Sequence, residues 1–173
     1  MNSLKGNAAL LQKLPVPQAV FPLATVLSGV VNLLFALVPL FAILVATGHH
    51  LTMSLMFTPV CILIATMFTL GVGLLLSPLA LFFTDTVEIV GVTLTLVLYL
   101  TPVFYPISII PNRLRKIVNY NPLSIILEVF REPIYDGVIP WTDVFTALLL
   151  AAVMLICGVV VFRRSSDRIP FYL

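Results

Sequence analysis

Residues 19–47 read AVFPLATVLSGVVNLLFALVPLFAILVAT, a stretch with no Lys, Arg, Asp or Glu. The uncharged run around it is longer still and extends from Leu14 to Thr84. A bilayer core about 30 Å thick needs roughly 20 apolar helical residues for each crossing, so this run is long enough for two transmembrane helices. The polar turn at 48–50 divides it, and we expect spans over 19–47 and 52–82.

Two shorter uncharged runs, Ile89 to Asn112 and Val144 to Phe162, predict one further span each, over 87–104 and 143–162. The composition agrees, because 61% of the residues are hydrophobic and 9% are charged, whereas about a quarter of the residues in a soluble domain are charged. The sequence therefore predicts an all-α membrane protein: one domain over 1–173 with about four transmembrane helices. The net charge of +2 does not suggest a nucleic-acid partner.

The segment 105–142, between the last two predicted spans, differs from the rest of the chain. It combines apolar residues with charged residues and five prolines, at positions 106, 111, 122, 133 and 140. This mixture favours short re-entrant or interfacial helices over a solvated loop. Helical spacing places Glu128 and Arg131 on one face, where they can form an ion pair.

Basic residues set the expected orientation in the membrane. Arg163, Arg164 and Arg168 follow the last span, and positive charge favours the cytoplasmic side. Residues 1–18 are then a cytoplasmic lead with a short helix over 7–14, and residues 105–142 are periplasmic. Cys61 and Cys157 lie inside predicted spans, so we expect no disulfide.

The sequence offers little for catalysis, metal binding or cofactor binding. His49 and His50 have no cysteine or carboxylate close in sequence that would complete a metal site. The G-x-x-x-x-G-K-[ST] motif that binds ATP phosphates does not occur. We therefore expect no enzyme activity, no cofactor and no metal.

Several motifs resemble the ABC-2 type permeases that export polysaccharides such as O-antigen, capsule and teichoic acid. They are Asn7–Lys13, Phe82-Phe83-Thr84-Asp85, Thr101-Pro102-Val103-Phe104-Tyr105-Pro106, Asn121-Pro122-Leu123 and Glu128-Val129-Phe130-Arg131. Their order resembles the later part of a family member, so we expect an N-terminally truncated permease without the first cytoplasmic helix and first two spans. Thr84 stands where the family usually has arginine.

The resemblance implies a permease subunit in the bacterial inner membrane. Two copies would pair with two separate ATP-binding subunits and move a lipid-linked glycan through the membrane lipid. Coupling to the ATPase would involve Asn7, Lys13, Asp85 and Glu88. The glycan exit would involve Tyr105, Tyr120, Glu128, Phe130 and Arg131, and the resemblance also favours a structural lock at Arg131.

Simpler interpretations stay open at each of these sites. Asp85 and Glu88 also suit an ordinary polar turn between helices, and the 7–14 helix suits an amphipathic lead on the bilayer surface. Phe104, Tyr105, Tyr120, Phe130, Tyr135 and Trp141 also suit an interfacial aromatic belt. For the whole chain, the alternatives are export of a drug or small lipid and a membrane scaffold without transport. The sequence does not distinguish the cargo.

Overall fold

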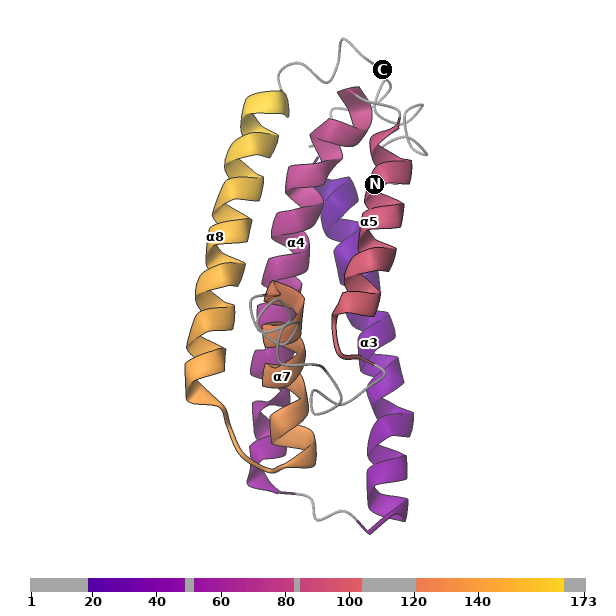
Figure 1. Ribbon diagram of the computed structural model, residues 1–173, viewed down its shortest axis with the longest axis vertical. Helices are drawn as coiled ribbons and strands as arrows, with labels where there is room; N and C mark the ends of the chain where they lie inside the picture. Colours follow the sequence, from indigo (N-terminus) through magenta and orange to yellow (C-terminus); the bar gives the residue numbers. More distant parts are fainter. Residues whose placement is uncertain (1–18, 49–51, 83–84, 104–120, 167–173) are drawn as a thin grey trace.

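The computed structural model describes residues 19–48, 52–82, 85–103 and 121–166 (Figure 1). These residues form α-helices and one short 3-10 helix, η1, and contain no strand. The predicted all-α fold is therefore confirmed. The elements are α3 (Val20–Ala46), η1 (Met53–Phe57), α4 (Thr58–Phe82), α5 (Thr86–Leu100), α7 (Pro122–Tyr135) and α8 (Trp141–Ser166).

Three stretches are long and apolar enough to cross a membrane: Val20–Ala46, Met53–Ala80 and Trp141–Ser165. They correspond to the first, second and fourth predicted spans. The third is shorter than predicted, because α5 has 15 residues and ends at Leu100. At 1.5 Å per residue α5 is roughly 22 Å long, less than the bilayer core.

Proline chemistry explains where α5 ends. Thr101 precedes Pro102 and has an extended backbone, with φ −80° and ψ 130°. A residue before proline is disfavoured in the helical region because the proline ring clashes with it. The predicted span over 87–104 therefore loses its last turn, and its final residue, Phe104, lies outside the described residues.

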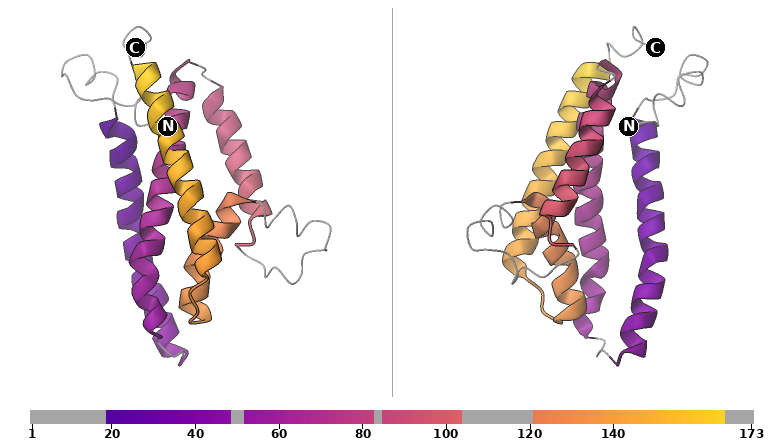
Figure 2. Two further views of the ribbon diagram at one scale, coloured as in Figure 1. Left: turned by 90° about the vertical axis from the view of Figure 1, so that its left-hand side faces the viewer. Right: turned by 45° about the vertical axis from the view of Figure 1, so that its right-hand side comes forward.

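Helices α5 and α7 together occupy the length that one transmembrane helix would fill. Figure 1 shows α5 ending partway along the bundle, and α7 beginning near that point and continuing toward the opposite end. Both views in Figure 2 show the same arrangement. The break between the two helices therefore lies partway along the bundle and not at either of its ends.

The core lies where α4, α7 and α8 meet. Its buried side chains are Cys61, Ile64, Phe68, Val129, Val144, Ala147 and Ala151. Helices α4 and α8 have the most extensive contact, and small residues let their backbones approach closely. A Cβ atom at Gly71 would lie 2.5 Å from the backbone of Met154 and Leu155.

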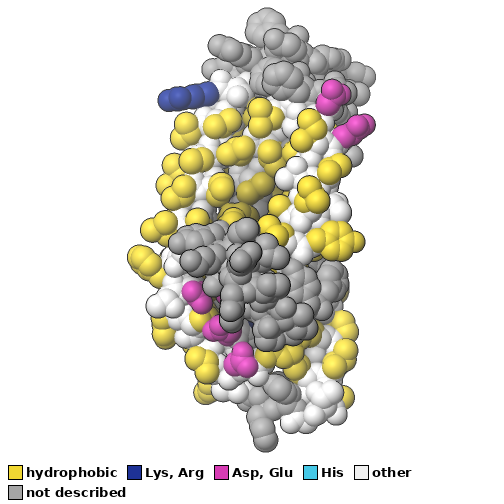
Figure 3. Space-filling model, viewed as in Figure 1, with side chains coloured by type: hydrophobic (Ala, Val, Ile, Leu, Met, Phe, Trp, Pro, Cys, Tyr) yellow, Lys and Arg dark blue, Asp and Glu magenta, His cyan; other side chains and the backbone are white. Residues whose placement is uncertain are grey.

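Helix α5 is packed differently, since none of its residues is buried. Most of its large apolar side chains are exposed, including Tyr99, which is 69% exposed. Figure 3 shows hydrophobic side chains over much of the long face of the bundle, and acidic side chains in two groups, one of them at the end where α5 begins. Such a surface suits contact with lipid chains.

A tight turn joins α7 to α8 and contacts the start of the second span. Gly137 has φ +67°, and the hydroxyl of Ser54 donates a hydrogen bond to its carbonyl oxygen. Beside this turn, the rings of Phe57 and Trp141 pack edge to face with centroids 5.8 Å apart. The turn therefore fixes α7 and α8 against η1.

We expect Gly137→Ala to destabilise the protein by about 1–2 kcal/mol, the cost of a left-handed backbone for a residue with a Cβ atom. The new Cβ would also lie 3.0 Å from Oγ1 of Thr52. Thermal unfolding in detergent micelles measures the effect. Gly91→Ala is the control because its Cβ would meet nothing within 4 Å; equal unfolding temperatures for the two variants would contradict the prediction.

Candidate functional site

The break between α5 and α7 brings together polar groups that are far apart in the sequence. The side-chain amide of Asn121 donates to Oγ1 of Thr101 at 2.9 Å, and both residues are buried. The Thr101 hydroxyl donates in turn to the carbonyl of Val97, at 2.8 Å, near the end of α5. The end of α5 and the start of α7 are therefore linked side chain to side chain.

Asn121 also starts α7. Its Oδ1 accepts a hydrogen bond from the backbone N–H of Leu123 at 3.1 Å, which is the usual role of asparagine before a helix. Pro122 follows at the first helical position, where the missing N–H costs nothing. One side chain thus begins α7 and ties it to α5.

Arg131 makes the second link between the two helices. Its Nη1 donates to the carbonyl of Pro102 at 2.7 Å, and its Nη2 donates to the carbonyl of Val103. These carbonyls follow the last turn of α5, where no helical N–H can reach them. The planar guanidinium suits them because its donors form a fixed fork.

Besides Glu128, its expected partner on the same helix, Arg131 has acceptors on a distant segment. Arg131 gives its hydrogen bonds to backbone carbonyls 28 and 29 residues away in the sequence. Helical spacing relates two side chains of α7, whereas these acceptors of Arg131 lie on another segment. Arg131, which was expected to act as a structural lock of the re-entrant segment, joins α7 to the end of α5.

Acidic side chains gather near the other end of α7. Glu128 and Glu132 belong to α7 and lie close enough to Asp143, in the first turn of α8, for their charges to interact. Glu132 also interacts with Asp136, at the end of α7. Within the described residues, no three or more His, Cys, Asp or Glu side chains are grouped so as to hold a metal ion.

Helix α7 is anchored much more firmly than α5. Val129 is 1% exposed in the core, and its carbonyl accepts a hydrogen bond from the thiol of Cys61 on α4 at 3.2 Å. The α4 helix makes fewer contacts with α5 than with α7. The hydrogen bonds from Asn121 and Arg131 therefore hold the end of α5, which is loosely packed, to α7, which is well packed.

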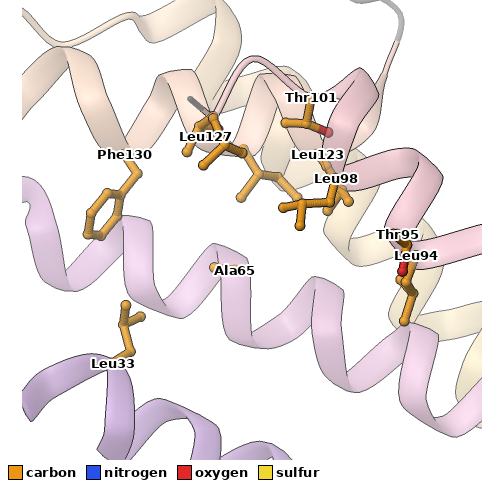
Figure 4. Close-up of a pocket in the computed structure, with 11 residues that line it drawn as sticks. Leu33, Ala65, Leu94, Thr95, Leu98, Thr101, Leu123, Leu127 and Phe130 are labelled. Atoms are coloured by element: carbon orange, nitrogen blue, oxygen red, sulfur yellow. The ribbon is translucent and has the colours of Figure 1, made fainter. Parts of the chain in front are cut away.

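A cavity of about 670 Å³ adjoins this break (Figure 4). It lies among α3, α4, α5 and α7, and apolar side chains form most of its wall. Phe130, expected at the glycan exit, lines it. The lining residues are Leu33, Ala65, Leu94, Thr95, Leu98, Thr101, Val103, Leu123, Ile126, Leu127 and Phe130.

The residues expected to couple the protein to an ATPase lie elsewhere. Asp85 and Glu88 are both exposed at the start of α5, where acidic side chains also interact favourably with the helix dipole. Figure 1 places this end of α5 at the same end of the bundle as the last turn of α8, which carries Arg163 and Arg164. The break between α5 and α7 lies well away from it.

Some of the residues chosen from the sequence fall outside the described residues. They are Asn7, Lys13, Tyr105 and Tyr120, and the same holds for His49, His50 and the expected helix over 7–14. No role was predicted for Thr101 and Asn121, although both belong to motifs that resemble the family. Each is a polar residue directly before a proline, and that pattern was the available signal.

The sequence model of the ABC-2 type transporter family matches residues 5–135 of this chain. The O-antigen export system permease protein RfbA of Klebsiella pneumoniae is 27% identical over 167 residues, covering 96% of this chain and 64% of the relative. RfbA of Myxococcus xanthus is 28% identical over 157 residues, covering 90% of this chain and 60% of the relative. This chain spans less than two thirds of the length of these curated relatives.

Proposed function

The chain belongs to the ABC-2 type transporter family, and we propose that it is a permease subunit of an ABC exporter for a lipid-linked polysaccharide of the O-antigen type. It is a multi-pass protein of the bacterial inner membrane. The observation that carries the proposal is the similarity to O-antigen export permeases over 90% or more of the chain. The broken α5–α7 unit supports it, because irregular backbone at membrane depth is tolerated only where protein or a water-filled path surrounds it.

The proposed exporter contains two copies of this subunit and a separate ATP-binding subunit. The absence of a phosphate-binding motif from the sequence is the reason to assign ATP hydrolysis to a partner. The basic residues Arg163 and Arg164 favour the cytoplasm for the end of the bundle where α8 ends. Asp85 and Glu88 lie at that end, and we assign them, with Asn7 and Lys13, to the surface that docks on the ATPase.

This orientation puts α7 in the periplasmic half of the membrane. A helix that begins inside the bundle and runs toward the periplasmic side suits a re-entrant segment, which we assign to 105–142. Glu128, Phe130 and Arg131, together with Tyr105 and Tyr120, are then the candidates for the glycan exit. Among them, Arg131 acts by holding the backbone of the break in place.

Export of O-antigen tests the proposed function. In cells that lack their own O-antigen permease, the protein produced with the ATP-binding subunit of the same system is expected to restore surface O-antigen. In proteoliposomes, ATP turnover is expected to accompany movement of the lipid-linked glycan. A scaffold would leave both unchanged, and an exporter of drugs or small lipids would turn over ATP without moving the glycan.

Charge reversal at Asp85 tests the coupling surface. We expect Asp85→Lys to lower export roughly tenfold, equivalent to about 1.4 kcal/mol of lost interaction with the ATPase. The assignment requires a basic surface on the ATPase opposite Asp85, and a lysine at position 85 would repel that surface. Asp136→Lys makes the same change at an exposed residue beyond the end of α7 and should leave binding of the ATPase intact. Unchanged export and unchanged co-purification of the ATPase with Asp85→Lys would overturn the assignment.

A further inference from the structure

The cavity among α3, α4, α5 and α7 lies at the depth of the bilayer centre. Leu33, which forms part of its wall, sits at the middle of the 27-residue span α3. Ala65 of α4, opposite α5 and α7, also belongs to a membrane span. The space therefore lies at a depth where the surrounding lipid is hydrocarbon.

Among the described residues that line the cavity, none offers a free hydrogen-bonding side chain. The hydroxyl groups in this part of the wall are those of Thr95 and Thr101. The Thr95 hydroxyl donates to the carbonyl of Gly91 at 2.9 Å. The Thr101 hydroxyl donates to Val97 and accepts from Asn121. Apolar cavities without polar partners do not hold ordered water, and an empty one would forfeit dispersion contacts along its whole wall.

The shape of the cavity suits a chain that runs along the membrane normal. In Figure 4 its labelled side chains follow α4, from Phe130 and Leu33 at one end to Leu94 and Thr95 at the other. Phe130 and Leu33 point toward one another across that first end. Lipid acyl chains run parallel to spanning helices, so a single chain can lie in this space lengthwise.

We propose that this cavity binds one acyl chain of a membrane phospholipid, which packs between the broken α5–α7 unit and the α3–α4 pair. The chain would support α5, which has no buried residue of its own. It would also contact Leu98, Thr101 and Val103, next to the carbonyl that Arg131 holds. The proposal does not depend on the transported cargo.

Fluorescence quenching by phospholipids with brominated acyl chains tests the proposal. The protein has one tryptophan, so Trp141→Phe gives a background without tryptophan, and Phe130→Trp then places a probe in the cavity wall. Phe145→Trp in the same background is the matched reference, because Phe145 is 69% exposed on the lipid-facing side of α8. The proteoliposomes contain only the brominated phospholipid, so no other lipid can supply the chain.

We expect comparable quenching of the Phe130→Trp and Phe145→Trp probes. Adding Ala65→Phe fills the cavity and should remove most of the quenching at the first probe while leaving the second unchanged. Val153→Phe, on the exposed side of α8, should change neither. Weak quenching of the Phe130→Trp probe would mean that protein side chains or another helix fill the cavity. Quenching that Ala65→Phe does not reduce would mean that the lipid lies outside the cavity. Either result would overturn the proposal.

Discussion

Arg131→Ala is expected to destabilise the protein strongly and to separate the end of α5 from α7. The substitution leaves the carbonyls of Pro102 and Val103 without donors. An unsatisfied buried polar group costs about 1–3 kcal/mol, so two of them cost about 2–6 kcal/mol. Removing a costly charge from membrane depth offsets part of that loss, and we expect the lower half of the range to be observed.

Unfolding in detergent, by heat or by titration with denaturing detergent, measures this loss. Arg131→Lys should retain part of the stability, because an ammonium group donates as a point charge and lacks the fork that reaches both carbonyls. Arg164→Ala is the matched control, since Arg164 is exposed in the last turn of α8. If the Arg131 and Arg164 variants unfolded alike, the two hydrogen bonds would not support the break.

Gly71→Ala is expected to disrupt the contact between α4 and α8. Its Cβ would lie 2.5 Å from backbone atoms of Met154 and Leu155, and backbone cannot rotate away as a side chain can. Overpacking typically costs about 1–3 kcal/mol, and we expect at least the upper end of that range here. Gly158→Ala should behave similarly, because its Cβ would lie 2.2 Å from the carbonyl oxygen of Gly71.

A change from glycine to alanine inside an apolar helix does not by itself cause such a loss of stability. Gly29→Ala and Gly91→Ala are also glycine-to-alanine changes inside apolar helices, and their Cβ atoms would meet nothing within 4 Å. Alanine favours helix over glycine by about 1 kcal/mol, so these controls should be neutral or slightly stabilising. Membrane yield and unfolding temperature compare the four variants, and equal values would show that the helices do not need this close approach.

The positions of the spans were predictable from the sequence, apart from the end of the third. Uncharged runs located Val20–Ala46, Met53–Ala80 and Trp141–Ser165 to within a few residues. The early end of α5 was not predicted, although Thr101 before Pro102 indicated it. Apolar composition continues through this point, so hydropathy alone gives no sign that the helix stops.

The candidate site was predictable only in part. Arg131 and Phe130 were chosen from the sequence, but with Glu128 as the expected partner of Arg131. The cavity that Phe130 lines was not foreseen. Helical spacing describes neighbours on one helix, whereas the acceptors of Arg131 and the residues opposite Phe130 belong to other helices.

The uncharged runs are enough to establish that this chain is a set of apolar helices in a bilayer. That information is local, because backbone groups in lipid must find their hydrogen bonds within each helical segment. The tertiary structure alone decided that Gly71 meets Gly158, that Arg131 holds the end of α5, and that a cavity remains beside it. These contacts join distant parts of the chain. Lipid outside the bundle is as apolar as the helices inside it, so hydrophobicity does not select which helix faces pack together. Small residues, which allow close approach, and a few buried hydrogen bonds select them instead.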